Sequence, residues 1–194
     1  MSTQNDLHRL KTGSAGFEDG TPNYLAAAAL PDGLALLHAV GIPALHRHVM
    51  RLTSRPLDGL TALRHGRGAP CVRVHGPATL DRRGATVAFN ITDTNGRVIP
   101  YAHLEDRART AGISVRGGCF CNPGASEHAF GFSAALARTC MERGLRSEEF
   151  SIARLAECMP GVPIGALRAS FGIPSNDRDV ERLIEVVSDS ARHA

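Results

Sequence analysis

The spacing of apolar residues along this 194-residue chain changes from helical to alternating and back to helical. Residues 24–40 are mostly apolar and predict a helix that restarts at Pro31, because proline fits best in the first turn of a helix. Thr21 is the expected N-cap, since its hydroxyl can accept a hydrogen bond from a backbone N–H of the first turn. Residues 42–55 predict a second, amphipathic helix, which Pro56 interrupts.

Alternation of apolar and polar residues replaces the helical spacing after residue 70. It predicts four short strands, at residues 71–75, 86–91, 113–116 and 166–171. Helices are predicted at residues 100–111, at 127–157 in two or three pieces around Gly131 and Gly144, and from a cap at Asn176 or Asp177 to the C-terminus. Strands that alternate with helices indicate an α/β or α+β sandwich, in which helices cover a small sheet.

This order of elements predicts three segments of different character. They are a polar lead-in at 1–16, a turn followed by helices at 17–66, and a small α/β domain at 67–194. No apolar run is long enough to span a bilayer, and the polar N-terminus lacks the apolar core of a signal peptide. We therefore expect a cytoplasmic protein without a membrane partner.

The charge of the chain argues against nucleic acid as a partner. The formal net charge is only +3, Lys11 is the single lysine, and the arginines are scattered with few aromatic residues between them. Nucleic-acid binding proteins instead gather their cations in a patch or interleave them with stacking aromatics. We expect a small molecule or another protein as the partner.

The chain has five cysteines, two of which lie one residue apart in a glycine-rich segment. In a cytoplasmic protein we expect free thiols, metal ligands or a catalytic group rather than disulfides, with Cys71, Cys140 and Cys158 in the core. Arg116, Gly117 and Gly118 precede the pair Cys119 and Cys121, and a Pro-Gly turn follows it. A neighbouring cation raises the thiolate fraction of a cysteine, so this segment predicts a loop that presents a reactive sulfur.

Zinc binding is an alternative interpretation of the same cysteines. It would combine Cys119 and Cys121 with His128 or Cys140. Structural zinc sites usually separate paired cysteines by two to four residues, and here a single residue separates them. The spacing favours a nucleophile over a metal site, so no metal is expected.

Three motifs occur in order along the chain: Phe17-Glu18-Asp19-Gly20-Thr21-Pro22-Asn23, Arg116-Gly117-Gly118-Cys119-Phe120-Cys121-Asn122-Pro123-Gly124, and Leu167-Arg168-Ala169-Ser170-Phe171-Gly172. Together they resemble the class V aminotransferase family. Within that family the chain looks most similar to cysteine desulfurases and to the desulfurase domain of molybdenum cofactor sulfurases. The resemblance implies the small C-terminal domain of a pyridoxal-phosphate-dependent transferase of fold type I, with a small, mostly antiparallel sheet preceded by inter-domain helices.

The resemblance also implies an activity and roles for particular residues. Pyridoxal phosphate would be the cofactor and L-cysteine the substrate, and Cys121 would attack the substrate sulfur and keep it as a persulfide. Arg168, assisted by Arg116, would bind the substrate carboxylate. Gly20 and Thr21 would reach the cofactor phosphate of the other subunit in a homo- or heterodimer.

Most of the cofactor-binding residues of the family have no counterpart in this chain. The Schiff-base lysine should precede the first motif, and Lys11 lies in a polar segment that does not resemble its surroundings. A separate large domain would therefore be needed for activity. Two alternatives are a cofactor-independent persulfide carrier and an interaction domain that has lost the chemistry. Gly117 stands where many relatives have threonine, which we expect to loosen the loop.

Overall fold

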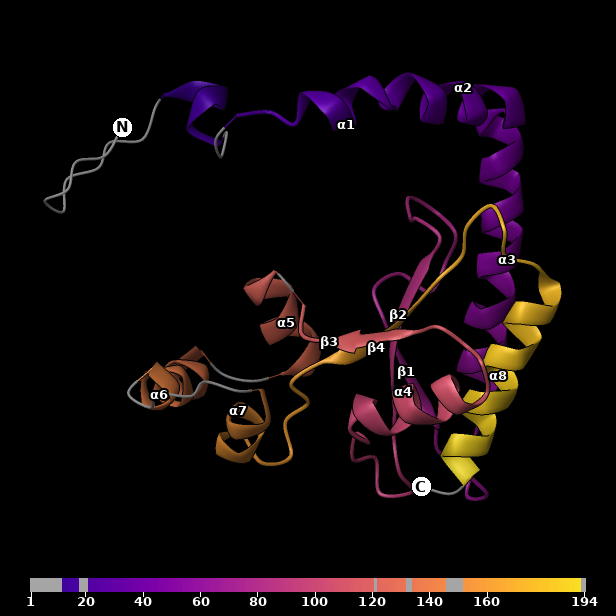
Figure 1. Ribbon diagram of the computed structural model, residues 1–194. Coiled ribbons are helices and arrows are strands. Elements are labelled where there is room, and N and C mark those ends of the chain that lie inside the picture. The colour runs from indigo at the N-terminus through magenta and orange to yellow at the C-terminus, as the bar shows by residue number, and fades with distance from the viewer. Residues whose placement is uncertain (1–11, 18–20, 121, 132–133, 146–151, 193–194) are drawn as a thin grey trace, which may run out of the picture. The chain divides into compact units, whose positions relative to one another are not determined.

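The computed structural model describes residues 12–17, 21–120, 122–131, 134–145 and 152–192 (Figure 1). The chain divides into two compact units, Met1–Ala44 and Leu45–Ala194. Their boundary falls within the predicted segment 17–66, inside a long helix. Predicted sites that involve Lys11, Gly20 or Cys121 lie outside the described residues.

The described part of the first unit consists of short helices. Its elements are the 3-10 helix η1 (Gly13–Phe17), α1 (Tyr24–Ala28) and α2 (Leu30–Val40). The restart is confirmed, because Pro31 lies in the first turn of α2. The N-cap prediction of Thr21 is wrong: the side chain of Asn23 accepts a hydrogen bond from the N–H of Ala26 at 3.0 Å. Asparagine caps at least as well as threonine, and Asn23 directly precedes the first helical residue.

Large apolar side chains of this unit remain exposed. Neither α1 nor α2 contains a buried residue. Leu25 is 88% exposed, and Leu30, Leu34 and Leu36 are at least 60% exposed. In the described part of the chain, no single helix is long and apolar enough to cross a membrane, although the bent pair of Tyr24–Val40 and Ile42–Ala62 passes that test when taken together.

Helix α3 (Ile42–Ala62) is longer than predicted, because Pro56 does not interrupt it. A proline inside a helix removes one backbone hydrogen bond and normally costs about 3 kcal/mol. Here the ring of Pro56 is fully buried, and Leu52, Leu57 and Leu60 of the same helix are 0–3% exposed. Packing of this apolar face offsets the lost hydrogen bond, which the local sequence pattern does not reveal.

The second unit is built on a four-stranded antiparallel sheet in the order β1-β2-β4-β3. The strands are β1 (Val72–His75), β2 (Thr86–Ile91), β3 (Arg116–Gly118) and β4 (Ala166–Ser170). All four strands were predicted, but β3 begins where the predicted strand ended. The third strand is therefore shifted into the glycines that precede the cysteine pair.

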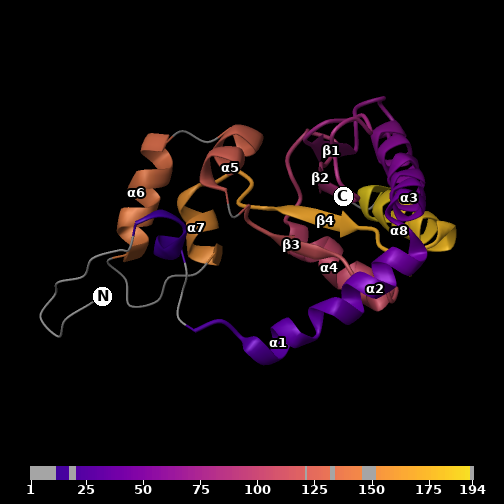
Figure 2. The same cartoon turned by 90° about the horizontal axis from the view of Figure 1, so that it is seen from above.

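One face of the sheet is covered by α3, α4 (Tyr101–Thr110) and α8 (Asp177–Arg192) (Figures 1 and 2). The inward residues of the central strands are Val87, Phe89, Ile91, Leu167 and Ala169, all at most 3% exposed. Side chains alternate between the two faces of a strand, so their neighbours in sequence point to the opposite face. That second face carries polar and charged residues.

Helices α5 (Pro123–Phe130), α6 (Ala134–Leu145) and α7 (Ile152–Cys158) lie between β3 and β4 in the chain. The predicted break at Gly131 is confirmed, since this glycine caps α5 with a φ of 69°. The predicted division near Gly144 is also confirmed, because α6 ends at Leu145, the next residue, and α7 begins at Ile152.

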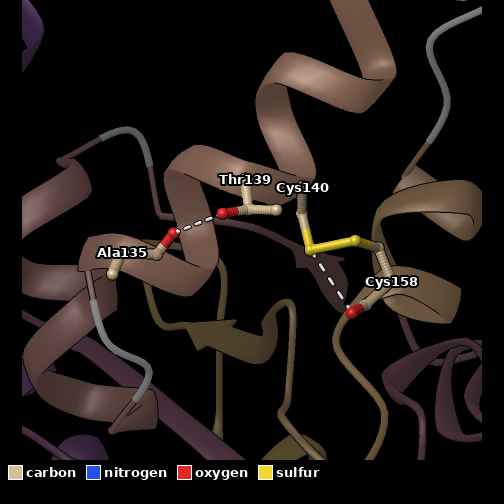
Figure 3. The surroundings of a disulfide bond; sticks show 4 residues. All are labelled: Ala135, Thr139, Cys140 and Cys158. Carbon is tan, nitrogen blue, oxygen red and sulfur yellow. Dashed lines mark hydrogen bonds between the residues drawn. A yellow bond between two sulfur atoms is a disulfide. The ribbon is translucent and has the colours of Figure 1, made fainter.

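A disulfide joins Cys140 of α6 to Cys158 of α7 (Figure 3). This corrects the expectation that the cysteines are unpaired. The two Cα atoms are 5.7 Å apart, within the range that a disulfide requires, although the residues are 18 positions apart in sequence. Of the three cysteines expected in the core, Cys71 and Cys140 are buried and Cys158 is half-buried.

We expect Cys158→Ser to lower the free energy of unfolding by about 2 to 3 kcal/mol under non-reducing conditions, because the bridge restricts the unfolded chain. Urea unfolding with and without a reductant checks this, and the reductant should change the wild type but not the variant. Cys71→Ser is a control for the loss of a thiol. Five free thiols in the unreduced, denatured wild type would contradict the disulfide.

The C-terminal helix α8 is fixed to α3 by ion pairs. As predicted, Asn176 lies at its start: its side chain accepts hydrogen bonds from the N–H groups of Arg178 and Asp179. Asp177 accepts from Arg51 at 2.5 Å and from Arg55 at 2.6 Å. The hydrogen bonds from Arg51, and then from Arg55, lower the pKa of the Asp177 carboxyl.

This lowered pKa predicts how stability depends on pH. Asp177 contributes its stabilisation fully above the pKa of an unfolded aspartate, about 3.9, and loses it as the pH falls through the lower folded value. Between about pH 5 and pH 3 the wild type should therefore lose stability more steeply than Asp177→Asn. Thermal unfolding across this range checks the slopes. Asp81→Asn, which removes an aspartate paired only with its neighbour Arg82, should leave the wild-type slope unchanged.

Candidate functional site

Four residues form one row across all four strands on the face of the sheet opposite to the helices. The strand register pairs His75 with Ala88, Ala88 with Arg168, and Arg168 with Arg116. Directly paired residues point to the same side of a sheet. Arg73 and Asn90, which pair with each other, belong to the same face. We call the face that carries His75, Asn90 and the three arginines the arginine face.

Arg116 and Arg168 are the two directly opposed cations of this row. Both side chains are exposed, and within the described residues neither guanidinium has a hydrogen bond or an ion pair. Like charges placed directly opposite each other destabilise a sheet. An anion bound between them would relieve that repulsion, and the planar guanidinium suits the two oxygens of a carboxylate.

The edge strand β3 is held from the helical side by α4. The carboxylate of Glu105 accepts a hydrogen bond from the N–H of Gly117 at 2.6 Å. A Cβ atom on Gly117 would lie 2.2 Å from the ring of Tyr101, so this ring occupies the space that a side chain would need. The expectation that Gly117 loosens the loop is therefore wrong, because its missing side chain lets α4 pack against the strand.

The cysteine loop begins directly after β3. Cys119 is a free, exposed thiol. Phe120 is half-buried: its ring centroid lies 5.9 Å from that of His75 and 5.1 Å from that of Phe130 in α5. Asn122 caps α5 by accepting a hydrogen bond from the N–H of Ala125 at 3.0 Å. The contact with His75 places Phe120 over the arginine face.

His75 is itself held in place by a buried amide. Its Nε2 lies 2.6 Å from Oδ1 of Asn90, and Nδ2 of Asn90 donates to the carbonyl of Gly165 at 3.0 Å. Because Oδ1 can only accept, His75 carries its proton on Nε2. Asn90 is 1% exposed, which fixes the orientation of the imidazole. Sequence analysis did not single out either residue, although the alternation of β1 places Arg73 and His75 on one face.

The structure does not place the remaining candidate residues at the arginine face. Thr21 is exposed in the first unit. The zinc alternative loses Cys140, which is bonded to Cys158. Among the described side chains, no three His, Cys, Asp or Glu residues are grouped closely enough to hold a metal ion. The thiol of Cys71 lies in the core, and burial raises its pKa.

Comparison with known sequences shows what this chain is similar to. The sequence profile of the family described as Aminotransferase class-V matches residues 2–183. A molybdenum cofactor sulfurase of Arabidopsis thaliana is 33% identical over 178 residues, covering 90% of this chain and 21% of that protein. The molybdenum cofactor sulfurase of Homo sapiens is 29% identical over 183 residues, covering 92% of this chain and 20% of that protein. The chain thus spans about a fifth of the length of these curated relatives.

Solved structures with a similar fold are cysteine desulfurases. The apo enzyme of Thermococcus onnurineus matches with a TM-score of 0.58 and 20% identity, over 100% of this chain and 38% of that one. A cysteine desulfurase of Escherichia coli matches with a TM-score of 0.55 and 18% identity, over 100% of this chain and 36% of that one. At these identities the likeness shows the fold, which agrees with the expected partial fold type I architecture.

Proposed function

Because this chain belongs to the class V aminotransferase family and is cysteine desulfurase-like, we propose that it is the sulfur-accepting C-terminal part of a desulfurase of the molybdenum cofactor sulfurase type. In this proposal Cys121 is the persulfide-forming nucleophile, and Arg168 with Arg116 binds the carboxylate of L-cysteine. The large cofactor domain is supplied either by a further part of the same polypeptide or by a partner chain.

The observation that carries the proposal is the pair of directly opposed arginines beside the cysteine loop, neither of which has an ion pair among the described residues. Arg116 and Arg168 are direct neighbours across β3 and β4, and the loop follows β3 directly. Phe120 brings the loop onto the same face through its contact with His75. A carboxylate held by the arginines would therefore place an amino-acid substrate next to the loop thiols.

The described residues do not form a pyridoxal-phosphate site by themselves. Lys11, the only lysine of the chain, lies outside them, and the exposed hydroxyl of Thr21 is the one predicted phosphate contact that the structure describes. When bound in the completed enzyme, the cofactor supplies an electron sink. This chain would contribute substrate binding and sulfur acceptance, and Gly20 and Thr21 would approach the phosphate only within a dimer.

The overall transfer needs no external oxidant or reductant. The Cys121 thiol and L-cysteine give a Cys121 persulfide and alanine. A sulfur–sulfur bond forms on Cys121 while the carbon–sulfur bond of the substrate breaks, and the carbon keeps the electron pair and takes a proton.

The exposed apolar residues of the first unit support the need for a large partner domain. Leu25, Leu30 and Leu34 are more than 60% exposed, and the relatives are about five times as long as this chain. Exposed large apolar residues of this kind are typical of an interface. We assign them to contact with the large cofactor domain.

Transfer of sulfur to this chain tests the proposal. The chain is incubated with an active cysteine desulfurase and L-cysteine, and the loop peptide is examined by mass spectrometry. We expect the added mass of one sulfur atom, lost in Cys121→Ser and retained in the matched control Cys119→Ser. Absence of the added sulfur in the wild type would contradict the accepting role.

A second measurement tests whether this chain needs a separate cofactor domain. Purified chain with pyridoxal phosphate should not show the absorbance of an internal aldimine. If such an absorbance appears and is lost in Lys11→Ala, the chain binds the cofactor itself and the need for a separate domain is wrong.

A further inference from the structure

We propose that His75 is a positioning residue of this site, whose ring seats Phe120 and thereby holds the cysteine loop over the arginine face. The inference rests on the proposed sulfur transfer for its functional consequence only. His75 lies outside the three family motifs, on the far side of the sheet from β3.

The geometry of the ring cluster carries this proposal. The His75 ring meets Phe120 at an interplanar angle of 83° and Phe130 at 84°, with centroids 5.9 and 5.3 Å apart. Edge-to-face arrangements at these distances are attractive. Phe120 directly follows Cys119, so its position constrains the backbone of that residue.

The fixed orientation of His75 holds its ring in one position against Phe120. Asn90 accepts from Nε2 of His75 and donates to the carbonyl of Gly165, the residue directly before β4. At 1% exposure, the Asn90 amide has no room to reorient. A histidine therefore combines two features here: a ring for Phe120 and an N–H for the buried oxygen.

These two features can be separated by substitution. His75→Phe keeps a ring of similar size but leaves Oδ1 of Asn90 buried without a donor, which should lower stability. His75→Gln keeps an N–H donor for Asn90 but removes the ring. The position of the cysteine loop should therefore depend on whether residue 75 has a ring. Stability should depend on whether residue 75 donates an N–H to Asn90.

The rate of chymotrypsin cleavage after Phe120 measures how firmly the His75 ring holds this residue. Phe17, which is 92% exposed in the first unit, gives the reference cleavage rate within the same molecule. We expect His75→Gln to raise the cleavage ratio of Phe120 to Phe17 roughly three- to tenfold, the change that loss of aromatic pairs supports. His75→Phe should stay within about twofold of the wild type. The control His103→Gln removes an exposed histidine of α4 and should change nothing.

Sulfur transfer from the donor enzyme to Cys121 should fall in His75→Gln by a similar factor and remain near wild type in His75→Phe. The proposal is overturned if both variants raise the cleavage ratio equally or if neither raises it. It is overturned too if the cleavage ratio rises together with the reactivity of the buried Cys71 thiol, because the whole second unit would then be opening. It is also overturned if cleavage rises without a loss of transfer. A wild type that accepts no sulfur would refute the proposed function, while the cleavage ratios would still decide the role of the ring.

Discussion

Arg168→Gln is expected to abolish anion binding at the arginine face while leaving the fold intact. Hydrogen bonds to charged groups contribute about 1.5 to 3 kcal/mol each, and a bidentate carboxylate makes two of them. In the completed enzyme, kcat/KM for L-cysteine should therefore fall by about two to four orders of magnitude. Stability should be unchanged or rise by a few tenths of a kcal/mol, because a repulsion across β3 and β4 is removed.

The chain alone allows a matched test of this prediction. Oxalate should raise the urea midpoint of the wild type above that in chloride of equal ionic strength, since a ligand that binds only the folded state stabilises it. The gain should disappear in Arg168→Gln and shrink in Arg168→Lys, which keeps the charge but loses the planar fork. Arg73→Gln is the control, because Arg73 lies on the same face but opposite Asn90. Equal losses in Arg73→Gln and Arg168→Gln would show only a general effect of charge.

The strands and most helices of the second unit were predictable, because their signals are local. Alternation marked β2 and β4, and the Asn176 cap marked the start of α8. Pro56 misled the prediction, since its cost is offset by burial against residues that the local pattern does not identify. The pairing of Cys140 with Cys158 depends on how α6 and α7 pack, which no spacing rule gives.

The sequence motifs nominate the residues of the candidate site but do not give their arrangement. Motif resemblance pointed to Arg116 and Arg168 separately, and only the register of β3 and β4 shows them directly opposed. His75 enters the same row through two further strand pairings. Register depends on contacts between strands distant in sequence, so a reading of one strand at a time cannot place these residues together.

Gly117→Thr, which introduces the residue that the family resemblance implies at this position, is expected to destabilise this chain by about 4 kcal/mol. A Cβ atom at position 117 would lie 2.2 Å from the Tyr101 ring and 2.9 Å from the carboxyl carbon of Glu105. Overpacking of this kind costs about 1 to 3 kcal/mol, and displacement of β3 would also break the charged hydrogen bond from the N–H of Gly117. Because β3 carries Arg116, anion binding should weaken together with stability.

A double-mutant cycle with Tyr101→Ala identifies the cause of that loss. If the clash with the ring is responsible, Gly117→Thr should cost less than about 1 kcal/mol in the Tyr101→Ala background, where the space is vacated. Gly84→Thr is the matched control, since a Cβ atom there meets nothing within 4 Å. Additive losses in the cycle would assign the cost to the contact with Glu105 rather than to the ring. A loss that disappears in the Tyr101→Ala background would show that Gly117 and Tyr101 depend on each other, because the ring from α4 fills the space that a threonine side chain would occupy.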